Sequence, residues 1–149
     1  MKTIATVGGL GRAPRLPGTV GSMVGAGLSW LLSSNPSIQI AGTVTVTALG
    51  FWSAGPAAAA LGAKDPPSVI IDEVAGMMVA LILLPADWRV YGAGFLLFRF
   101  LDILKPFGLR RLERFPGSVG IMLDDLAAGG LANFILLAVL KFDIPGLFR

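Results

Sequence analysis

The chain has 149 residues, which is enough for about one domain. Only 14% of the residues are charged and 54% are hydrophobic, whereas soluble domains average about 25% charged residues, so we expect an integral membrane protein. The sequence contains no Cys and no His, which excludes disulfides, thiol nucleophiles, and imidazole acid–base or metal chemistry. The net charge of +3 favours anionic partners but identifies none. Any chemistry must therefore use carboxylates, cationic side chains, hydroxyls or backbone groups.

Five apolar stretches follow one another along the chain, each bounded by turn-forming or charged residues. A helix needs about 20 mostly apolar residues to cross a bilayer. On that basis the spans are predicted at 19–32, 38–61, 69–84, 90–104 and 121–140. The Gly55-Pro56 pair predicts a kink in the second span. The sequence thus predicts one all-α domain over 1–149, a polytopic transmembrane helical bundle of about five spans.

Lys and Arg in the connecting loops set the expected orientation, because cytoplasmic loops carry an excess of positive charge. With five spans, the N-terminus, the 62–68 loop and the 105–120 loop share one side. That side carries Lys2, Arg12, Arg15, Lys64, Lys105, Arg110, Arg111 and Arg114, against Arg89, Lys141 and Arg149 on the other. We therefore expect the N-terminus in the cytoplasm and the C-terminus outside. A re-entrant turn at 33–37 would change this parity.

Acidic side chains gather on the predicted cytoplasmic side. They are Asp65, Asp72, Glu73, Asp102, Glu113, Asp124 and Asp125, whereas Asp87 and Asp143 fall on the other side. Three helices bring these acids to one depth, and a charge within a span should face the bundle interior and find a partner. Arg99 and Asp102 are spaced i,i+3 and can pair. Asp72 and Asp125 are each followed four residues later by a glycine, which lets helices approach closely. We expect an inward-facing acidic pocket.

Clustered carboxylates without His or Cys suit hard cations such as Mg²⁺, Mn²⁺ or Ca²⁺. Arg99, Lys105, Arg12 and Arg15 lie on the same face, where they could hold phosphate oxygens. A bound metal would polarise a phosphoryl oxygen and activate water, so these residues indicate metal-assisted phosphoryl chemistry at the headgroup plane. The Gly-rich segment 8–22 is a second candidate, since such a loop can present backbone N–H groups to phosphate. Close helix packing explains its glycines equally well.

Four ordered motifs extend over nearly the whole chain. They are Leu16-Pro-Gly-Thr-Val-Gly-Ser22, Asp65-Pro-Pro-Ser-Val-Ile-Ile-Asp-Glu-Val-Ala-Gly76, Phe98-Arg-Phe-Leu-Asp-Ile-Leu-Lys-Pro106 and Gly120-Ile-Met-Leu-Asp-Asp125. Together they resemble the phosphatidylglycerophosphatase A family. The resemblance implies Mg²⁺-dependent hydrolysis of the terminal phosphate of phosphatidylglycerophosphate, giving phosphatidylglycerol and inorganic phosphate. It also implies a multi-pass protein of the bacterial inner membrane whose active site faces the cytoplasm. Some relatives have His-Gly where this chain has Pro66 and Pro67, so a role for that His is unsupported here.

The motifs and the acidic pocket give one set of expected site residues. The expected catalytic and metal-binding residues are Asp72, Glu73, Asp102, Asp124 and Asp125. The expected phosphate-binding residues are Arg99, Lys105, Arg12, Arg15, Thr19, Ser22 and Ser68. Glu73 or Asp125 is expected to accept the proton of the attacking water. Direct attack by water is favoured over a phospho-aspartate because the chain lacks an Asp-x-Asp sequence.

Other classes of protein also place acids in a membrane. A CDP-alcohol phosphotransferase would resemble Asp-Gly-x-x-Ala-Arg followed by spaced aspartates, which this chain lacks. A cation transporter or channel subunit would prefer acids near mid-bilayer with access from both sides, whereas these acids crowd one face. A purely structural subunit is the third alternative. No nucleic-acid partner is expected, and a homodimer through the Gly-rich faces is one option. The number of metals and the tolerance for other lipid phosphates stay open.

Overall fold

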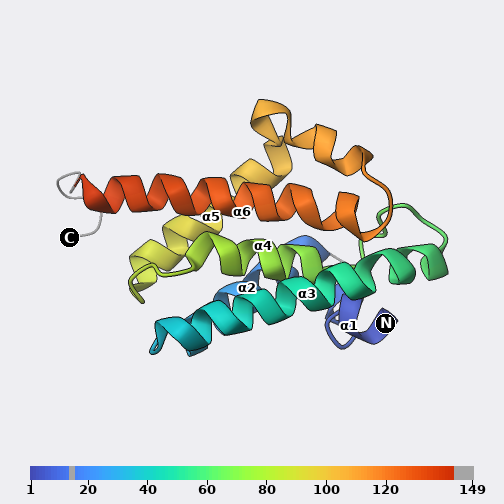
Figure 1. Ribbon diagram of the computed structural model, residues 1–149, viewed down its shortest axis with the longest axis horizontal. Helices are drawn as coiled ribbons and strands as arrows, with labels where there is room; N and C mark the ends of the chain where they lie inside the picture. Colours follow the sequence, from blue (N-terminus) through green and yellow to red (C-terminus); the bar gives the residue numbers. More distant parts are fainter. Residues whose placement is uncertain (14–15, 143–149) are drawn as a thin grey trace.

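The computed structural model describes residues 1–13 and 16–142, without the side chain of Phe107, and this part of the chain contains helices and no strands (Figure 1). The helices are α1 (Lys2–Ala5), η1 (Leu10–Arg12), α2 (Pro17–Leu32), α3 (Pro36–Leu61), α4 (Ile71–Leu81), α5 (Trp88–Leu104), η2 (Pro106–Arg114) and α6 (Ser118–Lys141). Helix α4 lies in the middle and packs on α2, α3, α5 and α6. The predicted all-α fold is confirmed for the described residues.

The connections between the helices fall at two opposite ends of the bundle (Figure 1). The N-terminus, the α3–α4 loop and the η2–α6 loop lie at one end. The α2–α3 turn, the α4–α5 connection and the end of α6 lie at the other end. The loops that the charge distribution grouped together therefore do lie at the same end of the protein.

Two of the described helices, α3 and α6, are long and apolar enough to cross a membrane by length and composition, with 26 and 24 residues. Helices α2 and α5 have 16 and 17 residues. Large apolar side chains point outward from several helices, among them Leu31, Trp52, Leu96, Phe100 and Phe134. Such an outer surface needs an apolar cover. The arrangement suits a membrane bundle, and only α3 and α6 have the length of a full span.

Helix α4 is shorter than the predicted 69–84 span. It covers 11 residues, which corresponds to about 16 Å of helix, against a hydrocarbon core about 30 Å thick. Nine of these residues are buried. The helix begins directly before Asp72 and Glu73, and the chain leaves it at Ile82, well before the next helix begins at Trp88. This segment is therefore a half-length helix enclosed by the other helices.

Two amide side chains from neighbouring helices bind the backbone at the end of α4. Asn133 of α6 donates from Nδ2 to the carbonyls of Ala80 (3.1 Å) and Ile82 (2.9 Å). Gln39 of α3 donates to the Leu81 carbonyl (3.4 Å), and its Oε1 accepts from the backbone N–H of residue 83 (3.0 Å). The last carbonyls of a helix have no partner within the helix, and leaving them bare in an apolar interior is costly. These two amides explain why α4 can end inside the bundle, which the hydropathy of 69–84 does not reveal.

Helix α3 continues through Pro56, the position of the predicted kink. Just before it, the N–H of Gly55 donates to the hydroxyl of Ser118 at the start of α6 (2.7 Å). A Cβ at position 55 would lie 2.6 Å from the Ser118 nitrogen, so only glycine allows this approach. The contact ties the end of α3 to the start of α6, next to the acidic residues of α6.

Candidate active site

Three carboxylates from two helices meet at the start of α4. Asp72 and Glu73 lie in the first turn of α4, and Asp125 lies on α6. One oxygen from each of the three side chains lies within 4.8 Å of the other two. Asp72 and Asp125 are buried, and Glu73 is partly buried. The acidic pocket expected from the sequence is therefore present, with these three residues at its centre.

Two glycines allow α4 and α6 to come close enough for this meeting. A Cβ on Gly129 would overlap the carbonyl oxygen of Gly76, and a Cβ on Gly76 would lie 2.7 Å from the carbonyl oxygen of Asp125. Both obstacles are backbone atoms, which cannot turn aside. The close approach of α4 and α6 that the spacing of acids and glycines predicted is confirmed.

Several oxygens of the cluster lack a protein partner. Asp72 Oδ1, Glu73 Oε2 and Asp124 Oδ1 are buried and accept no hydrogen bond from the described residues. Buried polar atoms are nearly always satisfied, so an unpartnered set of carboxylate oxygens calls for a positive partner. Carboxylate oxygens at this spacing are ligands of the kind that Mg²⁺ or Ca²⁺ takes. The residues present therefore fit a hard divalent cation.

A cationic side chain and the start of α2 border Glu73. Arg99 of α5 pairs with Asp102 one turn later, with 2.6 Å between Nη1 and Oδ2. A Cβ at Gly18 would lie 2.7 Å from Glu73 Oε1 and 3.2 Å from Arg99 Nη1. The first motif of the sequence is thus placed against both the acidic cluster and this arginine. Arg99 could contact a phosphate bound at the cluster if it turned from Asp102.

Lys105 links Asp124, an acid outside the trio, to the connection between α5 and α6. Its Nζ forms a short ion pair with Asp124 and a second one with Glu113 at 2.6 Å. Lys105 follows α5 in the left-handed conformation (φ 45°), which turns the chain into η2 and brings Glu113 back over the lysine. Asp124 is therefore partnered by a lysine in this structure, whereas the central trio is not.

Three groups that lie outside the long helices, Asp65, Lys105 and Glu113, have shifted pKa values. Burial lowers the pKa of Lys105, but its hydrogen bonds to Asp124 and Glu113 outweigh this and raise the pKa above its usual value. The bond from Lys105 lowers the pKa of Glu113. The pKa of Asp65 is raised, first because surrounding protein displaces water from its carboxyl and then because of the nearby charge of Asp124. Lys105 thus stays protonated at any physiological pH.

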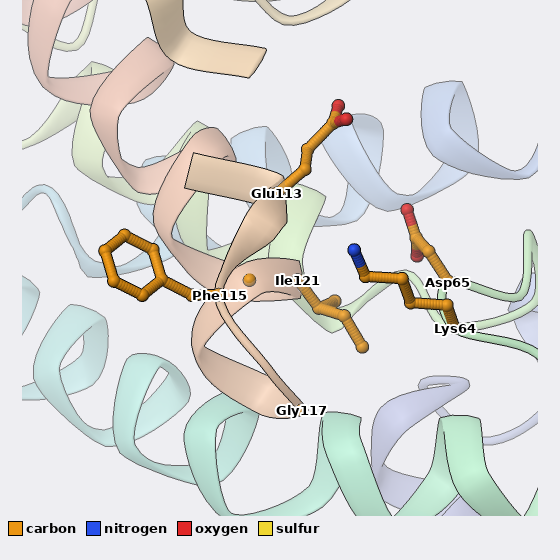
Figure 2. A pocket seen from close by; sticks show the side chains of 7 residues that line it. Lys64, Asp65, Glu113, Phe115, Gly117 and Ile121 are labelled. Carbon is orange, nitrogen blue, oxygen red and sulfur yellow. The ribbon is translucent and has the colours of Figure 1, made fainter. Parts of the chain in front are cut away.

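A small cavity of about 130 Å³ is lined in part by Glu113, the residue that pairs with Lys105 (Figure 2). Lys64 and Asp65 line it from the α3–α4 loop, Glu113 and Phe115 from the η2 region, and Ile121 from α6. The helical register places Asp124 three residues after Ile121 and on the same face of α6. The cavity is therefore linked to Asp124 through Glu113, which lines it, and Lys105, which pairs with both acids.

Among the described residues, the remaining predicted phosphate-binding side chains form no hydrogen bond or ion pair with the acidic trio. The Ser22 hydroxyl is buried and donates to the Gly18 carbonyl of its own helix (2.9 Å). Arg12 lines a separate small pocket with residues of the N-terminal segment. Ser68 is partly buried in the α3–α4 loop, and Thr19 is partly buried in the first turn of α2. Arg15 lies outside the described residues.

Glu113 was not predicted as a site residue. The sequence places it on the cytoplasmic side but gives no spacing that links it to Lys105, eight residues earlier. The link depends on the 3₁₀ helix η2, which returns the chain over the end of α5. In the sequence, Glu113 is the single acid of a segment, 110–114, whose other charged residues are arginines.

Fold and site together define an all-helical protein with an acidic pocket, suited to a hard cation, between two close-packed helices. Residues 3–140 match the family model for phosphatidylglycerophosphatase A. The chain is 36% identical over 132 residues to phosphatidylglycerophosphatase A of Escherichia coli K12, covering 86% of this chain and 76% of the relative. It is 35% identical over 127 residues to the Haemophilus influenzae protein of the same name, covering 83% and 78%. The chain belongs to the phosphatidylglycerophosphatase A family.

Another relative carries a different name. A protein of Bacteroides thetaiotaomicron, provisionally named a phosphatidylinositol-3-phosphatase, is 37% identical over 150 residues, covering 95% of this chain and 93% of the relative. No solved structure was found to match the chain. The named relatives thus share an action on a phosphate ester of a lipid headgroup.

Proposed function

We propose that this protein is a phosphatidylglycerophosphatase that removes the terminal phosphate of phosphatidylglycerophosphate with the help of Mg²⁺. The observation that carries the proposal is the trio of Asp72, Glu73 and Asp125, whose oxygens lie within 4.8 Å of one another in a chain that belongs to this family. The alternative of a cation transporter or channel lacks such support, because in the described part of the chain the acids gather at one end of the bundle and only Asp87 lies at the other.

The trio would hold the cation. Asp102 and Asp124 are neighbours of Asp125 and would lie beside the bound cation. When bound, Mg²⁺ would polarise a phosphoryl oxygen and make a coordinated water more acidic. The unpartnered oxygens of Asp72 and Glu73 support this role, because they are available without breaking any contact among the described residues. The cation would also remove the repulsion among three buried carboxylates.

The other residues of the site bind the phosphate and move a proton. Arg99 and Lys105 would donate to phosphate oxygens, each exchanging part of its contact with Asp102 or Asp124 for a contact with substrate. Glu73 or Asp125 would accept the proton of the attacking water. The N–H of Gly18, at the start of α2 and beside Glu73, would be the backbone donor nearest to the same place, because the N–H groups of Thr19 and Val20 already donate to the Leu16 carbonyl.

The topology supports an active site at the cytoplasmic headgroup plane. We propose five membrane passes, four formed by α2, α3, α5 and α6 and one formed by α4 together with the non-helical chain that follows it, with the N-terminus and the acidic end of the bundle in the cytoplasm of a bacterium. The support is the excess of Lys and Arg in the loops at the acidic end. Cysteine accessibility labelling at Ala63, in the α3–α4 loop, and Ala86, in the α4–α5 connection, would test the sidedness. A homodimer is a prediction that crosslinking in membranes would test.

A second substrate has one specific observation in its favour. The Bacteroides thetaiotaomicron relative covers most of this chain and is named for phosphatidylinositol 3-phosphate. Both lipids carry a phosphomonoester on a hydroxylated headgroup, so the same acidic trio could serve either. Comparing kcat/KM for the two lipids with the same preparation decides between them.

The direct test is phosphate release from phosphatidylglycerophosphate by the purified full-length protein in lipid nanodiscs. We expect release with Mg²⁺, none with excess chelator, and recovery when Mg²⁺ is restored. Asp125→Asn should lower kcat by at least about a hundredfold, since it removes a charged ligand or base. Asp87→Asn is the matched control, because Asp87 caps α5 at the opposite end and Asn caps a helix equally well.

Three results would count against the proposal. Full activity in the presence of chelator would refute the role of Mg²⁺. Near-normal turnover by Asp125→Asn would refute the catalytic role of the acidic trio. No release from either lipid by folded protein would remove the phosphatase function altogether.

A further inference from the structure

The cavity beside Asp124 has a composition unlike the acidic trio. It combines one cation, Lys64, with the carboxylates of Asp65 and Glu113 and a floor of Ile121 and glycines (Figure 2). Its volume of about 130 Å³ suits a small polar group rather than a whole lipid. A Cβ at Gly120 would overlap the carbonyl oxygen of Phe115, so the wall of the cavity requires glycine there.

Lys64 differs from the two cations that pair with acids of the site. Arg99 is paired with Asp102, and Lys105 is paired with Asp124 and Glu113. Lys64 forms no salt bridge to any described residue, although its charge acts on Glu113 from across the cavity. It is therefore the cation at this cavity whose charge is available without breaking an existing pair.

The substrates named for the relatives share a feature that the trio does not recognise. Phosphatidylglycerophosphate and phosphatidylinositol 3-phosphate each contain a second phosphate, the phosphodiester that joins the headgroup to diacylglycerol. In the first lipid a glycerol unit with one free hydroxyl separates the two phosphates, and in the second an inositol ring with several does so. A site that holds the reacting phosphate at the trio must therefore place a negative diester and at least one hydroxyl nearby.

We propose that this cavity is the subsite for the part of the headgroup that does not react. Lys64 pairs with the phosphodiester, and the carboxylates of Asp65 and Glu113 accept hydrogen bonds from the headgroup hydroxyls. The inference rests on the proposed phosphatase function and adds Lys64 to it as a specificity-determining residue. Glu113 lines the cavity and pairs with Lys105, which in turn pairs with Asp124, so a headgroup bound here lies next to the acids that would receive its terminal phosphate.

The test is steady-state kinetics of Lys64→Met on phosphatidylglycerophosphate in nanodiscs of a neutral lipid. We expect KM to rise by roughly fivefold with kcat unchanged, which is the upper end for the loss of one ion pair made by an exposed lysine. Inhibition by the product phosphatidylglycerol, which retains the diester, should weaken by a similar factor. Inhibition by inorganic phosphate, which binds only at the reacting site, should stay the same.

Two further variants separate recognition from a general effect of charge. Lys64→Arg should restore KM, because it keeps a positive charge at the rim of the cavity. Lys2→Met is the matched control, since Lys2 is an exposed lysine in the N-terminal segment at the same end of the protein and lines a different pocket. Lys2→Met should leave KM, kcat and the inhibition constants of phosphatidylglycerol and inorganic phosphate unchanged.

The inference and the proposed function can fail separately. A wild-type protein that releases no phosphate from this lipid overturns the proposed function. An active wild type whose Lys64→Met variant keeps its KM, loses kcat alone, or loses affinity for inorganic phosphate equally overturns the subsite. A matching rise of KM in Lys2→Met also overturns it, since the effect would then be long-range attraction of an anionic substrate.

Discussion

The close approach of α4 and α6 can be tested by adding one methyl group at Gly129. Its Cβ would overlap the Gly76 carbonyl oxygen and would also lie 3.0 Å from the Gly76 carbonyl carbon. Because the obstacle is backbone, the two helices must move apart, and overpacking of this kind costs about 1–3 kcal/mol. Gly130→Ala is the control, because a Cβ there meets nothing within 4 Å and Ala favours a helix by about 0.5–1 kcal/mol over Gly. We expect the free energies of unfolding of the two variants to differ by about 2 kcal/mol or more.

The same substitution should also disturb metal binding, since Asp125 lies one turn before Gly129 on α6. Unfolding in bicelles by a denaturing detergent measures the difference in stability, and titration of activity with Mg²⁺ measures the apparent affinity. We expect Gly129→Ala to need more Mg²⁺ for half-maximal activity than Gly130→Ala. Equal stability and equal Mg²⁺ dependence of the two variants would refute both the close packing of these helices and its role in positioning the acids.

Three other changes have outcomes that the structure determines. Asn133→Leu removes two hydrogen bonds to the end of α4 and should destabilise the protein by about 1–3 kcal/mol in bicelle unfolding, whereas Thr45→Val, at an exposed position, should cost almost nothing. Gly18→Ala places a methyl group 2.7 Å from Glu73 Oε1 and should lower kcat/KM in the phosphate-release assay, whereas Gly27→Ala, with open space around it, should not. Asp65→Asn should raise Tm at pH 7, because the raised pKa of Asp65 means that its ionised form destabilises the fold. That gain should shrink as the pH falls toward the usual pKa of 3.8, where wild type is protonated too; a Tm difference independent of pH would contradict it.

The composition and the spacing of acids predicted much of the architecture. Low charge and long apolar stretches predicted the helices, and the i,i+4 spacing of acids and glycines predicted that helices approach closely beside the acids, as α4 and α6 do. These features depend on local periodicity, which one sequence displays directly. The pairing of Arg99 with Asp102 was likewise visible as an i,i+3 spacing.

The features that the sequence did not reveal depend on contacts between distant segments. Hydropathy continues past Leu81, so only Gln39 and Asn133, more than 40 residues away in opposite directions, show where α4 ends. The 3₁₀ helix η2 brings Glu113 to Lys105, and no periodic pattern encodes that turn. Five acids at one depth resembled a single site, but Arg99 pairs with Asp102 and Lys105 pairs with Asp124, which leaves a central trio.

The hydrogen bonds from Gln39 and Asn133 to the end of α4 have a consequence for how the protein is made. When α4 leaves the ribosome, Gln39 has already been synthesised, but Asn133 has not. Ala80 and Ile82 then expose carbonyls that only α6 can satisfy. A segment of 11 residues is also too short to be inserted into a membrane by itself. We therefore expect α4 to settle only after the last helix has been synthesised, so that the acids of α4 and α6 meet at the end of assembly and a truncated chain forms no cation site.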